Sequence, residues 1–289
     1  MKRILLIASC LVFLTRIVGA QNGEALKIDA LTAESKEHFA EAAKLFEEAY
    51  QAFRAQTLAD TLCVFHAGLN YVRIGQFAKA IPFLDECIGL NINPGSSTRL
   101  LADSYVGLKQ PGKAEELLLE GKATMPEDST EFDEKLAYLY FNNGRYDKAT
   151  DCFQQVTQAH PENKNYLYLL GLSLHRIQKY DQAIAVFELM QTEFPEDRRA
   201  TKLLGVTLFE RADELYRAQV DSLVRHDQTS VGVHPEFEEL NEHYAQARAM
   251  LEKSLAEYPY DQLLISSLYK LYQRQGDAQR AEHMEKRIK

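Results

Sequence analysis

The sequence predicts an all-α fold, an α-solenoid in which antiparallel helical hairpins stack in chain order. The first observation is a periodic alanine, because Ala80, Ala114, Ala149 and Ala183 are separated by 34, 35 and 34 residues. An internal period near 34 residues is typical of stacked helical hairpins rather than of one globular core. The second observation is that apolar residues inside each period follow the spacing of one helix face. The pattern therefore indicates a binding solenoid and leaves its ligand open.

The clearest copy of the period covers residues 165–197, and each of its halves predicts one amphipathic helix. Apolar and small residues recur there at the i, i+3, i+4 and i+7 spacing. Pro195 closes the copy, since proline is common just beyond the end of a helix. The spaced residues are Leu167, Leu170, Gly171 and Leu174 in the first half and Tyr180, Ala183, Phe187 and Met190 in the second.

These residues resemble the tetratricopeptide repeat family, over nearly all of the chain beyond about residue 23. The family pattern has small residues at repeat positions 8 and 20, aromatic residues at 11 and 17, a large apolar residue at 24 and proline near 32. The small residues let two antiparallel helices approach closely. The chain departs from the pattern in having no tryptophan and in carrying Pro111 where one aromatic belongs. The copy over 130–163 supplies Ala137, Tyr140, Tyr146, Ala149, Phe153 and Pro161.

The sequence divides into five parts, of which the resemblance covers those beyond about residue 23. We expect a signal peptide at 1–20, a degenerate first repeat at 21–60 and four regular repeats at 61–197. A repeat with an inserted helical arm follows at 198–261, and a short capping hairpin at 262–289. Terminal repeats of a solenoid present a wettable outer face, so irregular ends are expected.

The repeat at 198–261 is longer than the others. It begins normally with Leu204 and Gly205, but its second half, which contains Ala247 and Pro259, comes about 30 residues late. Helical spacing continues on both sides of a polar loop at 226–235, so we expect one elongated hairpin with an arm at about 213–243. At about 1.5 Å per residue the arm reaches on the order of 15–20 Å. It is either a tolerated insertion or a surface for self-association or partner contact.

The first residues predict export. A basic start at 1–3 precedes a short apolar run at 4–14, and small residues at 18–20 precede Gln21. A membrane-spanning anchor needs about 20 apolar residues, so the run indicates a cleaved secretory signal. We expect a periplasmic protein of a bacterial envelope. The alternative is a lipoprotein anchored through Cys10, because the residues before it resemble a lipoprotein box.

The charge and the cysteines restrict the partners and the chemistry. Loss of the signal removes three basic residues and takes the formal net charge from -9 to -12. Nucleic acids are bound by basic surfaces, so this acidic chain is not expected to bind them. An odd number of cysteines remains without a short-spaced pair, and we expect buried free thiols at Cys63, Cys87 and Cys152. A bridge between Cys63 and Cys87 is the alternative.

No pattern of residues indicates an enzyme. The sequence contains no nucleophile elbow, no glycine-rich phosphate loop and no paired-histidine metalloprotease motif. His226 and His234, with Asp227 and Glu236 nearby, match no rigid metal template. We therefore expect a solvated acidic loop there, and neither a catalytic residue nor a metal or cofactor.

The resemblance implies a concave groove lined by the first helix of each repeat, with repeat positions 2, 5, 9 and 12 facing it. Aromatic residues exposed in such a groove suit peptide recognition, and the alternative is that some of the rings pack under neighbouring repeats. The family's clamp for a terminal carboxylate uses Lys, Asn and Arg, and it is not expected where Phe65, Leu69 and Arg99 stand. The candidate groove residues are Phe65, Arg99, Asp103, Tyr138, Phe141, Tyr168, His175, Lys202 and Phe209.

We expect an exported, non-catalytic scaffold or adaptor that binds a peptide segment or helix of another envelope protein in this groove. No transmembrane segment is expected. The alternative is a structural subunit of an envelope assembly, such as outer-membrane protein biogenesis or secretion machinery, with self-association through the 213–243 arm left open. A sugar-binding or hydrolytic envelope protein needs a site that the sequence does not offer.

Overall fold

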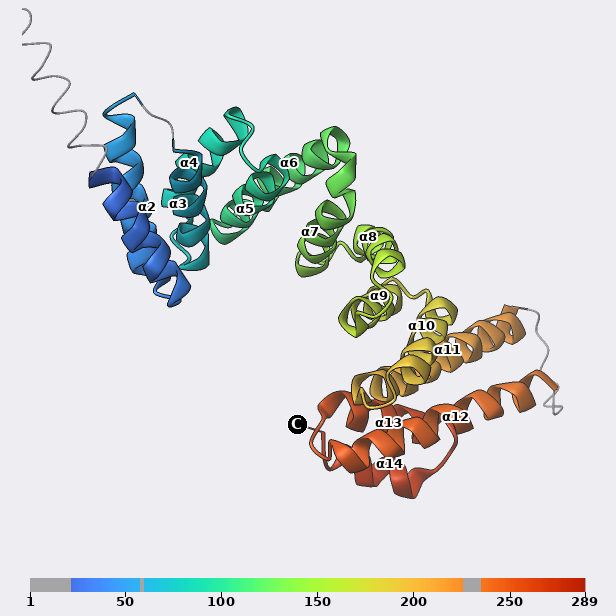
Figure 1. Ribbon diagram of the computed structural model, residues 1–289. Coiled ribbons are helices and arrows are strands. Elements are labelled where there is room, and N and C mark those ends of the chain that lie inside the picture. The colour runs from blue at the N-terminus through green and yellow to red at the C-terminus, as the bar shows by residue number, and fades with distance from the viewer. Residues whose placement is uncertain (1–21, 58–59, 226–234, 289) are drawn as a thin grey trace, which may run out of the picture. The chain divides into compact units, whose positions relative to one another are not determined.

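The computed structural model describes residues 22–57, 60–225 and 235–288, and all regular structure in these residues is helical. Within each of the two units described below, consecutive helices pack against each other (Figure 1). The predicted all-α fold of stacked helical hairpins is confirmed. The helices are a first one at 22–35, then α2 Phe39–Arg54, α3 Thr61–Arg73, α4 Phe77–Gly89, α5 Pro94–Gly107, α6 Pro111–Thr124, the 3₁₀ turn η1 Pro126–Asp128, α7 Ser129–Asn142, α8 Tyr146–Ala159, α9 Lys164–Arg176, α10 Tyr180–Glu193, α11 Arg198–Arg225, α12 Pro235–Glu257, α13 Gln262–Arg274 and α14 Ala278–Glu285.

Two of the sequence-based predictions lie outside the described residues. One is the signal peptide at 1–20 with the alternative lipid anchor at Cys10. The other is the loop that contains His226, Asp227 and His234. Both stay predictions.

The helices fall into two compact units, Met1–Leu139 and Tyr140–Lys289, whose boundary lies within α7, and each unit is described by itself. In the first unit, α2, α3, α4, α5 and α6 pack in chain order. Its core includes the fully buried Phe46, Tyr71 and Leu84. A β-carbon at Gly68 would lie 2.9 Å from Leu84 Cδ2, so the small residue at repeat position 8 lies directly against the large one at position 24.

The second unit repeats this packing from α8 to α14. A β-carbon at Gly171 on α9 would lie only 2.6 Å from Cε1 of Phe187 on α10. The Phe187 ring is fully buried together with Leu174 and Met190. The clearest copy of the repeat therefore forms a close-packed hairpin, and the absence of a side chain at Gly171 makes room for the ring.

One hairpin of the second unit is much longer than the others. Helices α11 and α12 contain 28 and 23 residues, whereas α3, α4, α9 and α10 contain 13 or 14. This confirms the predicted elongated hairpin. A first helix of 13 residues would end at Glu210, so α11 continues for about 15 further residues, roughly 22 Å of helix. Phe209 on α11 packs against Tyr244 on α12, with ring centroids 6.2 Å apart.

The cysteines of the described residues are free thiols. Cys63 and Cys87 are buried, as predicted, and Cys152 is half-buried. The alternative bridge between Cys63 and Cys87 is therefore wrong. Burial raises the pKa of Cys63 to about 12 and that of Cys87 to about 11. Both thiols are protonated at neutral pH and are poor nucleophiles, because the thiolate is the reactive form.

Candidate functional site

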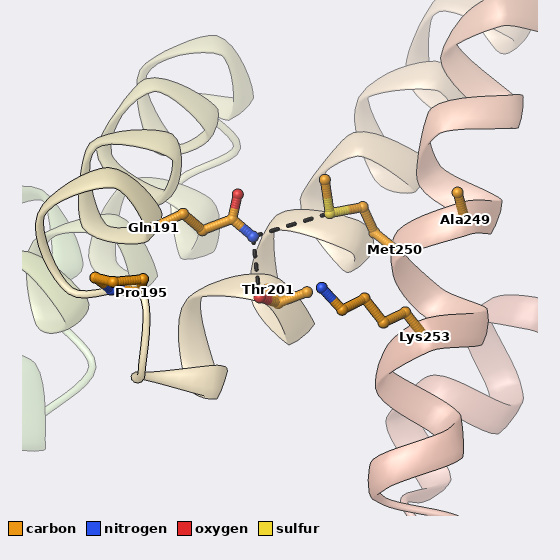
Figure 2. A pocket seen from close by; sticks show the side chains of 6 residues that line it. All are labelled: Gln191, Pro195, Thr201, Ala249, Met250 and Lys253. Atoms are coloured by element: carbon orange, nitrogen blue, oxygen red, sulfur yellow. Dashed lines mark hydrogen bonds between the residues drawn. The ribbon is translucent and has the colours of Figure 1, made fainter.

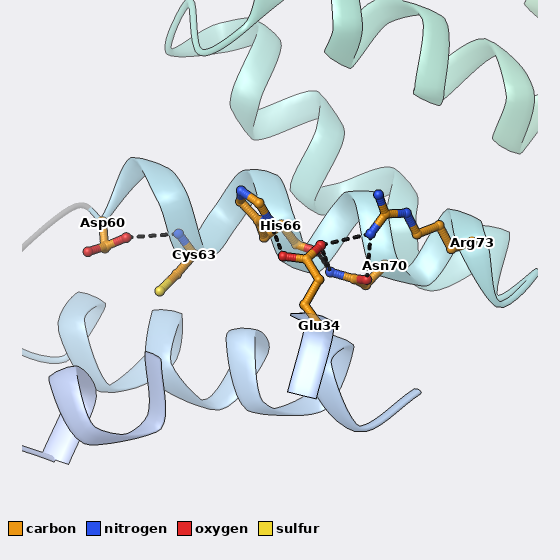
Figure 3. A network of polar contacts seen from close by, with 6 residues as sticks. All are labelled: Glu34, Asp60, Cys63, His66, Asn70 and Arg73. Atoms are coloured by element: carbon orange, nitrogen blue, oxygen red, sulfur yellow. Dashed lines mark hydrogen bonds and ion pairs between the residues drawn. The ribbon is translucent and has the colours of Figure 1, made fainter. Parts of the chain in front are cut away.

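In each unit, polar side chains join the first helices of successive repeats, and we call the surface that they share within that unit its first-helix face. In the first unit, Glu34 on the helix at 22–35 points toward α3 (Figure 3). Its carboxylate lies 2.8 Å from His66 Nδ1 and accepts hydrogen bonds from Asn70 Nδ2 at 2.9 Å and Arg73 Nη1 at 2.8 Å. Asn70 is fully buried and the Arg73 side chain is 40% exposed, so the network extends from the interior of the unit to its surface.

Two of the predicted groove residues take part in the same kind of link between α5 and its neighbours. Asp103 accepts a hydrogen bond of 2.7 Å from Nζ of Lys135 on α7. Arg99 lies 3.5 Å from Asp128 Oδ2, and its guanidinium lies 5.5 Å from the centre of the Phe132 ring. Both side chains already have partners within the first unit, and they hold consecutive repeats together.

In the second unit, His175 joins α9 to α11. Its Nδ1 lies 3.0 Å from Thr207 Oγ1, and its Nε2 lies 3.4 Å from Glu210 Oε2. Burial lowers the pKa of His175 below its usual value; Glu210 opposes this effect and Arg176 adds to it. The imidazole is therefore neutral at pH 7, and Glu210 has a neutral neighbour rather than a cation.

Tyr168 and Lys202, two more of the predicted groove residues, also contact other residues of the second unit. The guanidinium of Arg199 lies 4.5 Å from the ring centre of Tyr168, and its Nη2 donates to Asn165 Oδ1 at 3.0 Å. Lys202 on α11 donates to Asp261 Oδ2, at the start of α13, over 2.5 Å. These contacts bridge α9, α11 and α13 in turn.

Four of the five predicted aromatic groove residues, all except Tyr168, differ in exposure. Phe65 and Tyr138 are half-buried in the first unit, and Phe141 is half-buried in the second unit against Tyr146 and Phe153. Phe209 is only 3% exposed, so nearly all of its ring lies in the core rather than on an open surface. The alternative that some rings pack under neighbouring elements thus describes Phe209.

A polar pocket of about 300 Å³ opens where α11 continues past the length of a regular first helix, and we call it the α11 pocket. The turn between α9 and α10 forms one wall and α13 contributes another. Asp213, Glu214 and Arg217 belong to the extra length of α11, so the pocket exists because this hairpin is elongated. The lining residues are Gln178, Tyr180, Phe209, Glu210, Asp213, Glu214, Arg217 and Lys270.

Most of the charges around the α11 pocket are paired with one another. Asp213 is 8% exposed and accepts hydrogen bonds of 2.5 Å from both Arg217 and Arg274. Glu214 lies 3.1 Å from Arg211, which also binds Asp181 through two nitrogens at 2.7 and 3.1 Å. These arginines hold the charged side chains of the pocket wall in place, because a bidentate arginine–carboxylate pair restricts the orientation of both side chains.

Two charged groups of the α11 pocket have no such pairing. Lys270 makes no ion pair within 4.0 Å in the part of the chain that the structure describes, and its side chain is exposed. Glu210 is 38% exposed and has only the neutral His175 and the hydroxyl of Tyr180 as neighbours in the described ranges. Burial raises the pKa of Tyr180 to about 12, and the charge of Glu210 and the hydrogen bond to it add to this effect.

A second pocket of about 380 Å³ lies between α10 and α12, and we call it the α12 pocket (Figure 2). Gln191 donates to Thr201 Oγ1 at 3.0 Å and lies 3.9 Å from the sulfur of Met250. The polar groups in its centre thus satisfy each other, and Lys253 is the charged residue on its wall. It has fewer charged groups than the α11 pocket to recognise a ligand.

The described ranges contain neither a candidate membrane span nor a candidate metal centre. No helix among these residues has the length and apolar character to cross a membrane. No group of three or more histidine, cysteine or carboxylate side chains in them has the geometry to hold a metal ion.

The stacked hairpins and the shared first-helix face define an α-helical repeat protein. Residues 134–198 match the family model of the tetratricopeptide repeat. The match supports, over these residues, the family resemblance that the repeat pattern predicts. No curated protein matches the sequence.

Solved structures with this fold come from several bacteria. A tetratricopeptide repeat protein from Parabacteroides merdae is 16% identical with a TM-score of 0.57, over 91% of each chain. The C-terminal part of a repeat-containing protein from Cytophaga hutchinsonii is 12% identical with a TM-score of 0.61, over 90% of this chain and 92% of that one. MamA from Desulfovibrio magneticus is 16% identical with a TM-score of 0.53, over 61% of this chain and 97% of that one. At these identities the likeness shows the fold.

The residues of the α11 pocket were mostly missed by counting repeat positions. Lys270 stands at position 9 of the last hairpin, when Gln262 is counted as position 1, so extending the count would have found it. Asp213, Glu214 and Arg217 lie in the insertion, where the repeat pattern assigns no position. The continuing helical spacing indicated an arm, but it did not indicate that the base of the arm forms a wall beside α13.

Proposed function

We propose that the protein is a non-catalytic scaffold that binds a segment of a partner protein on its first-helix face. The observation that carries this proposal is the α11 pocket, which lies on that face. Among the described residues Lys270 makes no ion pair, and Glu210 lies beside the neutral His175 and pairs with no arginine or lysine. Extended segments are recognised by grooves with pockets for individual side chains. The repeat family supports the proposal, because repeat stacks provide extended binding surfaces.

We further propose that this scaffold works after export, in the envelope of a bacterium. The basic start, the short apolar run and the small residues before Gln21 support this localisation. Fractionation of cells, with mass spectrometry of the mature N-terminus, tests it. A chain that begins at Gln21 in the periplasmic fraction is expected, whereas an intact Met1 in the cytoplasm would contradict export.

A structural subunit of an envelope assembly is the second candidate, and the elongated hairpin is the observation in its favour. Helices of 28 and 23 residues provide more surface than a repeat needs for its own packing. This function predicts that deletion of the distal arm releases the protein from a membrane-associated complex. Co-fractionation that is unchanged by the deletion would favour the scaffold instead.

Pull-down from envelope extract tests the proposed scaffold. The mature chain serves as bait beside a charge-reversed variant, Glu210→Lys with Lys270→Glu, which keeps the net charge. Lys253→Glu is the matched control, because Lys253 is an exposed lysine of the same unit in the α12 pocket. We expect the control to retain a partner that the charge-reversed variant loses. Equal recovery by all three baits would contradict binding of the partner on the first-helix face of the second unit.

A further inference from the structure

The α11 pocket contains one partly exposed carboxylate, Glu210, that forms no ion pair with an arginine or a lysine among the described residues. His175 Nε2 lies 3.4 Å from Oε2 of Glu210, and Tyr180 lines the same pocket. Both neighbours are neutral at pH 7. The neighbouring carboxylates of Asp213 and Glu214, by contrast, bind arginines.

We propose that the α11 pocket receives a basic side chain, arginine or lysine, from the segment bound on the first-helix face; this inference rests on the proposed function. Glu210 is the charged acceptor for the cation, and Tyr180 contributes an aromatic wall beside it. The volume of about 300 Å³ lies at the lower end for ligand pockets, so the pocket suits one side chain rather than a whole small molecule.

Lys270 is the group that would favour an acidic ligand, and its properties make it the weaker anchor. Its side chain is exposed and makes no ion pair among the described residues, so an anion would have to immobilise a flexible lysine. An anion at that point would also face the carboxylates of Glu210 and Glu214. The Glu210 side chain is only 38% exposed, so it has less freedom to lose on binding than the exposed lysine.

The proposal is tested by titration of the full mature chain with blocked amino acids, followed by NMR of labelled tyrosine and histidine side chains. The probes are N-acetyl-arginine methylamide and N-acetyl-glutamate methylamide. We expect the arginine probe to shift the resonances of Tyr180 and His175 with saturation in the millimolar range, and the glutamate probe to leave them unchanged. Binding of the glutamate probe alone, or of neither probe, would overturn the proposal.

Two variants with opposite expected effects separate recognition from folding. Glu210→Gln is expected to weaken binding of the arginine probe about tenfold, as loss of a charge-assisted hydrogen bond does. Lys270→Gln is expected to strengthen it about twofold to threefold, because it removes a repelling charge. A gain in affinity cannot result from misfolding. Unchanged affinity in Glu210→Gln, with Lys253→Gln as the matched control, would exclude Glu210 as the acceptor.

The titration and the pull-down can fail separately. Binding of the arginine probe together with equal recovery by all pull-down baits would contradict the proposed function. The preference of the pocket for a basic side chain would still stand. A partner that is lost in the charge-reversed bait, with no binding of the arginine probe, would retain the first-helix face and overturn the basic anchor.

Discussion

Replacement of Gly171 by alanine tests the close packing on which the repeat stack depends. The added β-carbon would lie 2.6, 2.8 and 3.0 Å from Cε1, Cζ and Cδ1 of Phe187. The Phe187 ring is fully buried, so it has no free space to move into. Either α9 and α10 separate or the ring leaves its favoured rotamer, and both responses lower the stability of the fold.

The expected magnitude follows from two opposing effects. Overpacking costs about 1–3 kcal/mol, whereas alanine in place of glycine inside a helix contributes about 1 kcal/mol. We expect the free energy of unfolding to fall by about 1 kcal/mol, as measured by urea denaturation with circular dichroism. The double variant with Phe187→Leu is the control, since a smaller side chain relieves the contact and makes the two losses non-additive. A stabilised single variant, or strictly additive losses, would refute the reasoning.

Three further predictions concern charge, pH and thiol access. Asp213→Ala leaves two arginines without their shared carboxylate, and we expect the free energy of unfolding to fall by about 2 kcal/mol, since both guanidiniums still reach water; an unchanged urea midpoint would count against this pairing. Burial lowers the pKa of His175, so its contribution to stability is complete above about pH 6.5 and is lost as the pH falls below that value. His175→Gln is expected to flatten the acid side of the pH–stability curve, and parallel curves would contradict it. Cys63 and Cys87 are expected to react with a thiol reagent only after unfolding, and mass spectrometry of the native protein that finds either adduct would show that these thiols are accessible.

The sequence predicted the fold well because the repeat pattern describes local contacts. Gly171 and Phe187 lie 16 residues apart, and their types report directly on the packing of one helix against the next. Extended helical spacing on both sides of the inserted loop likewise predicted the lengths of α11 and α12. These features can be predicted without information about contacts between residues that are distant in the sequence.

The candidate site was predicted less well, because it depends on contacts between repeats. Asp103 and Lys135, like His175 and Thr207, lie 32 residues apart, and the repeat pattern assigns positions without saying which polar side chains pair. Phe209 has a groove position but packs on Tyr244, which the insertion places 35 residues away. Counting positions therefore located the first-helix face, and only the structure separated its internal links from the α11 pocket.

Site-specific photocrosslinking in cells tests the central claim most directly, namely that a partner is held on the first-helix face of the second unit. A photoreactive amino acid replaces Lys270 in one strain and Lys253 in another, since both are exposed lysines of that unit. We predict a discrete protein adduct at position 270 and only background at 253. An adduct at 253 alone, or no adduct at 270 under conditions where the partner is expressed, would contradict the account.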